Sequence, residues 1–172
     1  MGRDKLSLRF NGRTLLESAV SRFSGVFEDV FLSVADEGKY PFIGARRVVD
    51  IHPGAGPLSG LHAALSCLPG DGVFIVAGDL PYSCPHAAML IAGLCGGHGA
   101  CAIRLPDGRV EPLFGYYRKA ALPFCEMALA SGDYRMSAIL HSAGARFVGP
   151  AELGGLWDDR IILNVNEPGV LG

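Results

Sequence analysis

The sequence contains no apolar run of the roughly 18–20 residues that a membrane-spanning helix needs, no secretory signal segment and no C-x-x-C pair. Because its 5 cysteines are odd in number and lack that spacing, neither a disulfide framework nor a cysteine-bound zinc ion is predicted. Acidic and basic residues are also nearly balanced, with 17 Asp and Glu against 15 Lys and Arg. The formal net charge of −2 argues against a nucleic-acid or membrane-surface footprint, so we expect a cytoplasmic protein with neither partner.

Apolar side chains, in contrast, are plentiful. Hydrophobic residues make up 49% of the 172 residues, which is enough for a sizeable core and argues against disorder. A chain of this length usually forms one domain, so we predict a single domain over residues 1–172, and we expect a monomer. Most of the cysteines should be small buried hydrophobes.

Strand and helix signals alternate through the first part of the chain. Thr14 and Glu17 have the spacing of a capping box, which predicts a helix from there to Gly25. The stretch 72–77 is apolar without alternation, as is typical of a strand covered on both faces. Further strands are predicted over 29–35 and 46–50, and further helices over 57–68 and 83–95. This order predicts right-handed crossovers and a mostly parallel sheet.

The pattern changes after Gly99. Two strands, 100–104 and 110–117, flank a Leu-Pro-Asp-Gly turn, which predicts an antiparallel hairpin. Helices are predicted over 123–130 and 136–143, and short strands over 145–148 and 161–163. The predicted class is therefore α/β, a three-layer α/β/α arrangement whose mostly parallel sheet carries an antiparallel hairpin excursion.

Polar groups follow three of the predicted strands, at the sheet edge where open α/β folds bind ligands. Asp79 follows the apolar strand 72–77, and magnesium bridging a nucleotide phosphate would satisfy its carboxylate. A helix N-cap or a surface turn is the alternative. Asp50 precedes a loop with three glycines, suited to grip a base or a phosphate, or else an ordinary connection. The segment 164–168 offers an asparagine oxygen as a metal ligand, or simply an Asx-turn before Pro168.

Taken together, five segments resemble the molybdenum cofactor guanylyltransferases over the whole chain. They are Met1-Gly-Arg-Asp-Lys5, Pro53-Gly-Ala-Gly-Pro-Leu-Ser-Gly60, Gly78-Asp-Leu-Pro81, Glu111-Pro-Leu-Phe-Gly-Tyr-Tyr117 and Asn164-Val-Asn-Glu-Pro168. The resemblance implies a nucleotide-diphospho-sugar transferase-like fold. It also implies an enzyme that binds GTP and Mg²⁺ and transfers GMP to the terminal phosphate of molybdopterin, releasing pyrophosphate. Molybdoenzymes or their chaperones would be its protein partners.

The same resemblance implies individual roles. Lys5 would contact the nucleotide phosphates, and Lys5 and Asp79 would be the catalytic residues. Asp79 would hold magnesium, with Asn166 as a second metal or phosphate ligand. Asp50 would lie in the guanine nucleotide pocket, and Ser33 stands where the family often has an asparagine that contacts the nucleotide. The loop beside the base would contribute Gly56, Pro57, Leu58 and Gly60.

One part of the family pattern is absent. The family begins with a strand and a loop close to Leu-Ala-Gly-Gly-x-Ser-x-Arg, whose amides cradle the triphosphate. Its loss would remove a central parallel strand and leave an unpaired gap in the sheet. Either the native protein is longer by roughly 15–20 residues, enough for one strand and its loop, or the chain is a remnant that no longer catalyses. We expect this chain alone to bind GTP poorly.

Other interpretations stay open. The reaction could be transfer of CMP to molybdopterin or of a nucleotide to a sugar phosphate, although the segment 56–60 favours guanine. A non-catalytic nucleotide-binding or accessory protein is the alternative from another class. The five histidines show no metal-ligand spacing. Arg104, Arg109 and Arg118 flank the hairpin, where one would touch a molybdopterin phosphate unless all three are solvated, and Trp157 is expected to anchor a loop.

Overall fold

The computed structural model describes residues 5–7, 9, 10 and 12–164. Its helices are α1 (Leu15–Ser24), α2 (Pro57–Cys67), α3 (Pro85–Leu94), α4 (Leu122–Ser131), α5 (Met136–Ser142) and α6 (Pro150–Leu153), with 3₁₀ turns η1 (Lys5–Ser7), η2 (Lys119–Ala121) and η3 (Gly154–Leu156). Its strands are β1 (Arg9–Phe10), β2 (Arg13–Thr14), β3 (Phe31–Val34), β4 (Arg46–Val49), β5 (Gly72–Val76), β6 (Ala100–Arg104), β7 (Val110–Arg118) and β8 (Arg146–Val148). No helix in this part of the chain is long and apolar enough to cross a membrane.

The described strands form three separate sheets. β1 and β2 make a small antiparallel hairpin, and β3 runs parallel to β4. The largest sheet has the order β5-β7-β6-β8, in which β7 is antiparallel to both β5 and β6, and β6 is parallel to β8. The predicted hairpin over β6 and β7 is therefore confirmed.

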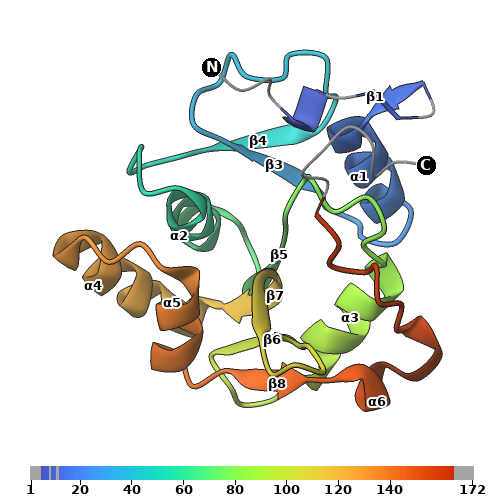
Figure 1. Ribbon diagram of the computed structural model, residues 1–172. Coiled ribbons are helices and arrows are strands. Elements are labelled where there is room, and N and C mark those ends of the chain that lie inside the picture. The colour runs from blue at the N-terminus through green and yellow to red at the C-terminus, as the bar shows by residue number, and fades with distance from the viewer. Residues whose placement is uncertain (1–4, 8, 11, 165–172) are drawn as a thin grey trace.

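Helices cover both faces of the large sheet (Figure 1). On one face, α2, α4 and α5 bury an apolar cluster that includes Leu61, Tyr117 and Leu140. On the other, α3 packs with the end of α1 around Phe23, Ile91 and Phe114. This arrangement confirms the α/β class.

Local sequence signals explain where α1 and α2 begin. The Thr14 amide donates to Glu17 Oε2 at 2.7 Å and the Glu17 amide donates to Thr14 Oγ1 at 3.1 Å, so the predicted capping box is formed. Helix α2 begins at Pro57, whose missing N–H costs nothing in the first turn. The residue before it, Gly56, has a φ of +59° that favours glycine.

The predicted strand over 161–163 is wrong, because the chain turns twice there. The amide of Ile161 donates to the Asp158 carbonyl and that of Leu163 to the Arg160 carbonyl, both at 2.8 Å. The guanidinium of Arg160 also pairs with the Asp158 carboxylate, which favours the turn. Ile161 is fully buried, so its apolar character reflects an anchor in the core rather than a strand.

A gap separates the β3-β4 sheet from the four-stranded sheet. β3 is bonded to β4 alone and β5 to β7 alone, and no ladder joins β3 to β5 within the described residues. β5 has the expected apolar sequence, but all five of its residues are only half-buried, because one side of the strand has no neighbour. The unpaired gap expected from the sequence is therefore present.

Most cysteines are buried, as predicted. Cys95, Cys101 and Cys125 are buried, Cys84 is half-buried and Cys67 is exposed. Burial raises the pKa of the Cys101 thiol to about 12 and that of Cys125 to about 11.

Candidate functional site

Asp79 lies in the turn that follows β5, and this turn is held by α1. The Arg22 guanidinium donates from Nη2 to the Leu80 carbonyl at 3.1 Å and to Ser83 Oγ at 3.0 Å. Ser83 Oγ in turn donates to the same carbonyl at 2.9 Å. Burial lowers the pKa of Arg22, although it has no carboxylate partner among these contacts. The backbone beside Asp79 is thus fixed by a half-buried cation on another element.

Asn164 reaches the carboxylate of Asp79 from the far end of the chain. With its amide nitrogen facing Asp79, Asn164 donates to Oδ1 at 2.7 Å and to Oδ2 at 2.8 Å. The opposite amide orientation would set oxygen against oxygen, so the hydrogen-bond pattern selects this one. Asp79 and Asn164, 85 residues apart in the sequence by their numbers, therefore meet at one point.

Lys5 and Asn166 were predicted to complete this end of the site. Lys5 belongs to η1, and its neighbour Leu6 packs against the turn: a Cβ added to Gly78 would lie 3.0 Å from Leu6 Cδ2. The backbone of η1 is thereby placed next to Asp79. The side chain of Lys5 and the whole of Asn166 lie outside the described residues, so their roles stay predictions.

Ser33, Asp50 and Gly60 form a second group. A Cβ added to Gly60 would overlap the Ser33 hydroxyl and lie 3.8 Å from Asp50 Oδ1, so the absence of a side chain at Gly60 allows the close approach. Burial raises the pKa of Asp50, and a hydrogen bond from Ser33 partly opposes this rise. The structure thus brings together three residues that the sequence assigned to nucleotide binding.

The rest of the predicted loop has mixed surroundings. Gly56 and Pro57 are exposed at the start of α2, where amide N–H groups face outward. Leu58 is fully buried in the core, so its side chain fixes the helix rather than facing a ligand. Ser59 Oγ donates to the His52 carbonyl and closes the loop on itself.

The three arginines around the hairpin and Trp157 make contacts within the protein. Arg104 stacks over Phe147, Arg109 pairs with Asp107, and Arg118 donates to the Gly96 carbonyl. Trp157 packs on the core and donates to Asp159, as expected of a loop anchor. Two histidines that seemed scattered are neighbours: the rings of His52 and His62 lie 4.8 Å apart, centroid to centroid.

The donor set suits a hard cation bound together with a nucleotide. Among the described residues, no three His, Cys, Asp or Glu side chains come together as a self-sufficient metal site. Mg²⁺ in nucleotide sites typically needs only one or two carboxylates, with phosphates and water completing six oxygen ligands. Asp79 at the strand end, with the Asn164 amide beside it, fits this pattern.

Carboxylates after two strands of an α/β fold, with a glycine-rich loop between them in the chain, suit the binding of a nucleotide. Residues 1–147 match the model of the MobA-like NTP transferase domain, and the chain belongs to this family. Its curated relatives agree. The "Molybdenum cofactor guanylyltransferase" of Cereibacter sphaeroides is 29% identical over 171 residues, covering 97% of this chain and 84% of its own. A "Probable molybdenum cofactor guanylyltransferase" of Geobacillus sp. is 27% identical over 175 residues, covering 97% and 87%.

Solved structures confirm the fold. The molybdopterin-guanine dinucleotide biosynthesis protein A of Archaeoglobus fulgidus superposes with a TM-score of 0.83 at 24% identity, over 99% of this chain and 88% of its own. The 2-C-methyl-D-erythritol 4-phosphate cytidylyltransferase of Thermus thermophilus has a TM-score of 0.69 at 16% identity, over 97% and 90%. The nucleotide-diphospho-sugar transferase-like fold expected from the sequence is thus confirmed.

Sequence reasoning missed two residues of the site. Arg22 carries no local signal, because its contacts with Leu80 and Ser83 span 58 and 61 residues. Asn164 stood inside a segment already singled out, but the resemblance directed attention to Asn166 instead. The only signal for Asn164 in the sequence was its position directly after the apolar residues 161–163. That it lies against the Asp79 carboxylate is seen only in the structure.

Proposed function

We propose that the chain transfers GMP from GTP to the terminal phosphate of molybdopterin, in the biosynthesis of the molybdenum cofactor. A phosphate oxygen of molybdopterin attacks the α-phosphorus of GTP. One P–O bond forms there, and the bond from that phosphorus to the bridging oxygen breaks, so pyrophosphate leaves. The names of the relatives support this reaction, and so does the pairing of Asp79 with Asn164, the observation that carries the proposal.

Each group has a physical task in this reaction. Asp79 would hold Mg²⁺, which when bound neutralises phosphate charge, and Asn166 would add a second oxygen ligand. Asn164 orients the Asp79 carboxylate through its two hydrogen bonds. Lys5 would neutralise further negative charge. Since several anionic groups must approach one another, positioning and neutralisation are the main demands on the protein.

The second group would select the base. Asp50 is a partly desolvated carboxylate, and such a group accepts hydrogen bonds strongly from ring N–H groups or ribose hydroxyls. Ser33 holds it in place, while Gly56 and Pro57 offer an exposed edge for a flat ring. This combination supports GTP as the nucleotide.

Competition binding tests the proposal. Labelled GTP is displaced by GTP, CTP, ATP or UTP in the presence of Mg²⁺, and we expect GTP to compete at least about tenfold better than the others. Preference for CTP would point to cytidylyl transfer, and binding of none of them would contradict the proposal.

Transfer itself is followed by pyrophosphate release with molybdopterin as acceptor. Asp79→Asn should lower the rate by about 10²–10³, as for other preorganised charge contacts. Asp71→Asn is the matched control, because Asp71 lies exposed just before the other end of β5. Equal losses in both variants would argue against a specific role for Asp79.

A further inference from the structure

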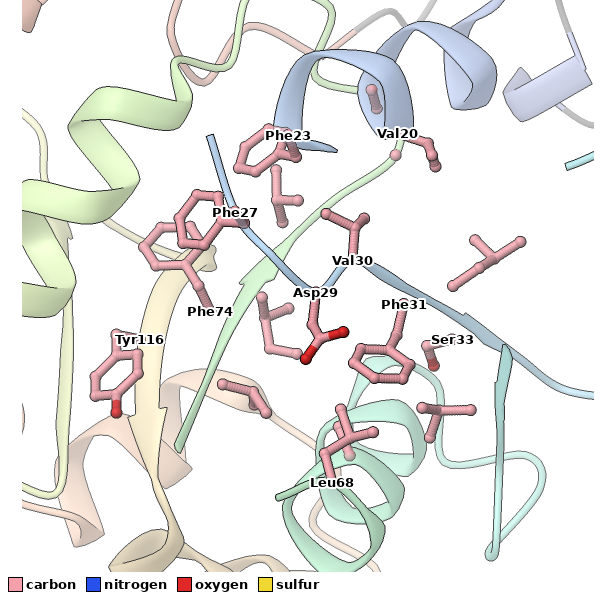
Figure 2. Close-up of a pocket in the computed structure, with 18 of the residues that line it drawn as sticks. Val20, Phe23, Phe27, Asp29, Val30, Phe31, Ser33, Leu68, Phe74 and Tyr116 are labelled. Carbon is pink, nitrogen blue, oxygen red and sulfur yellow. The ribbon is translucent and has the colours of Figure 1, made fainter. Parts of the chain in front are cut away.

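Helix α2 has three faces, and only one of them is polar. The face towards β3 carries Ala64 and Leu68, which line a cavity of about 490 Å³ together with Ser33 (Figure 2). The second face belongs to the cluster shared with α4 and α5 and consists of Leu58, Leu61 and Leu65. The polar face follows the spacing i, i+3, i+7 and consists of Ser59, His62 and Ser66. Because Ser59 and His62 are buried, this face packs against another part of the chain.

That part is the loop from His52 to Gly56, which we call the glycine-rich loop. Ser59 Oγ donates to the His52 carbonyl. The His62 ring lies against the His52 ring, with 4.8 Å between the centroids and 70° between the planes. Such an edge-to-face contact is a favourable arrangement of two aromatic rings. His52 is therefore held through its backbone and through its side chain, by two residues one turn apart on α2.

The rest of the glycine-rich loop has little else to hold it. Gly54 and Gly56 have φ of +96° and +59°, and a Cβ added to either would meet no atom of the described chain within 4 Å. Glycine also changes its backbone conformation more easily than other residues. Between His52 and α2, Ala55 is the buried residue. The contacts of His52 therefore restrict the conformation of the whole loop.

His62 makes its contact as a buried ring with one unsatisfied atom. It is 6% exposed, and its Nδ1 has no hydrogen-bond partner among the described residues. A protonated imidazole carries an N–H on both ring nitrogens, so charging His62 would bury an N–H without an acceptor. The neutral ring with its proton on Nε2 leaves only a lone pair there. The closed loop therefore favours neutral His62.

The surrounding charges act in the same direction. Burial lowers the pKa of His62, the charge of His52 lowers it further, and Glu126 of α4 opposes both in part. Strands β3 and β5 contribute no charged side chain to the surroundings of α2. The titratable groups of β4 and β7, and the one that follows β4, are Arg46, Arg47, Glu111, Tyr116, Tyr117, Arg118 and Asp50. Most of these have other partners, namely Asp29 for Arg46, backbone groups for Arg47, Glu111, Tyr117 and Arg118, and Ser33 for Asp50.

We propose that His62 is a positioning residue for nucleotide binding, which holds the glycine-rich loop against α2 through the ring of His52. The proposal rests on the proposed function, in which this loop lies beside the guanine base. His62 itself does not touch the nucleotide. The closed loop has its full advantage above about pH 6.5, the ordinary pKa of histidine. That advantage is lost as the pH falls from there through the lowered pKa of His62, because the open loop lets His62 take up a proton more readily.

The first measurement uses the full chain without nucleotide. NMR relaxation gives the backbone order parameters of Gly54, Ala55 and Gly56, which should be near 0.85 at pH 7.5 and fall below about 0.6 at pH 5.5. His62→Phe keeps a ring against His52 but cannot titrate, so its loop should stay rigid at both pH values. His62→Ala removes the ring, and its loop should be mobile at both. His141→Phe is the matched control, because His141 lies exposed on α5, and it should behave like the parent chain.

The second measurement is the affinity of the same chains for GTP in the presence of Mg²⁺. Titration of the nucleotide and of Asp50 is common to all of them, so affinities are compared with the parent at each pH. At pH 7.5, His62→Phe should bind like the parent, and His62→Ala about three- to tenfold more weakly, as expected for the loss of one aromatic pair. At pH 5.5, His62→Phe should bind about three- to tenfold more tightly than the parent.

Two results would overturn the proposal. A loop that becomes mobile at pH 5.5 in His62→Phe as well would assign the change to other groups. Equal order parameters and equal GTP affinity in the parent, His62→Phe and His62→Ala would leave His62 with a purely structural role, even if the alanine variant were less stable. Failure of the proposed function looks different: the order parameters would follow the expectation, which supports the role of His62 in the loop, while none of the chains would bind GTP.

Discussion

Arg22 of α1 donates to the carbonyl of Leu80 at 3.1 Å, directly after the residue that would hold the metal. This contact ties the turn after β5 to a helix rather than to the sheet. Because the same guanidinium also reaches Ser83, one side chain fixes both ends of the turn. We therefore regard Arg22 as a positioning residue for Asp79.

Replacing Arg22 with methionine should lower the free energy of unfolding by about 1.5–3 kcal/mol, the usual range for hydrogen bonds to a charged group. Urea unfolding measures this. Arg13→Met is the matched control, since Arg13 makes one exposed contact with Ser21 at 3.3 Å, and its effect should stay below about 0.5 kcal/mol. Mn²⁺ affinity in the presence of GTP, followed by EPR, should also fall in Arg22→Met and recover in part in Arg22→Lys. An unchanged Mn²⁺ affinity would make Arg22 structural only.

Gly60→Ala should destabilise the protein by about 1–3 kcal/mol, because the new Cβ overlaps the Ser33 hydroxyl. Combining it with Ser33→Ala should recover part of that loss, while the Ser33 Cβ remains 3.2 Å away. In contrast, Gly93→Ala in α3 meets no atom within 4 Å and should stabilise by about 0.5–1 kcal/mol. Thermal unfolding of Gly60→Ala, Ser33→Ala, the double variant and Gly93→Ala, each compared with the parent chain, measures these effects. Strict additivity of the Gly60 and Ser33 changes would contradict the predicted contact.

Asp50→Asn should stabilise the free protein at pH 7. The pKa of Asp50 is raised in the folded state, so the folded state binds this proton more tightly than the unfolded chain. Stability therefore falls as the pH rises from about 4 through the raised pKa, and the loss persists at neutral pH. The variant should remove that loss and, under the proposed function, also weaken GTP binding.

A carboxylate whose pKa shifts in the opposite direction serves as the control for Asp50. Arg109 lowers the pKa of Asp107, so the ionised Asp107 favours folding above its ordinary pKa. Asp107→Asn should therefore not stabilise the protein at pH 7, and GTP binding should not change. Denaturation at pH 4, 5, 6 and 7 measures both variants, and a destabilised Asp50→Asn would refute the desolvation argument.

Asn164→Asp places a second carboxylate against Asp79, at the position where the amide now donates. Without divalent metal, like-charge repulsion should lower the melting temperature. With Mg²⁺, two carboxylates should bind the ion about tenfold more tightly, and the melting temperature should rise with Mg²⁺ concentration. Asn164→Ala is the comparison, because it removes the hydrogen bonds without adding charge. If Mg²⁺ has no effect on Asn164→Asp, the metal does not bind beside Asp79.

Local signals were sufficient for much of the fold. The capping box at Thr14 and Glu17, the proline that opens α2 and the turn between β6 and β7 each depend on residues within a few positions, and each prediction was confirmed. The apolar run at Ile161 misled for the same reason, because periodicity does not distinguish a buried turn from a short buried strand.

The site was predictable only in part. Ser33, Asp50 and Gly60 were all singled out, and the structure brings them together. The reach of Asn164 to Asp79 and of Arg22 to Leu80 depends on how helices and turns pack over long sequence separations, which no local pattern encodes. The half-buried state of β5 likewise depends on a neighbouring strand rather than on its own residues.

Because the five thiols differ in burial, their reactivity reports whether the chain is folded. Cys101 and Cys125 remain protonated at neutral pH and are enclosed, so an alkylating reagent reaches them only after the core opens. Cys67, exposed at the end of α2, reacts in the native state. Counting labelled thiols by mass spectrometry thus separates intact from opened molecules in one sample. It also identifies Cys67 as the residue to replace with serine before storage, because oxidation would first cross-link two chains there.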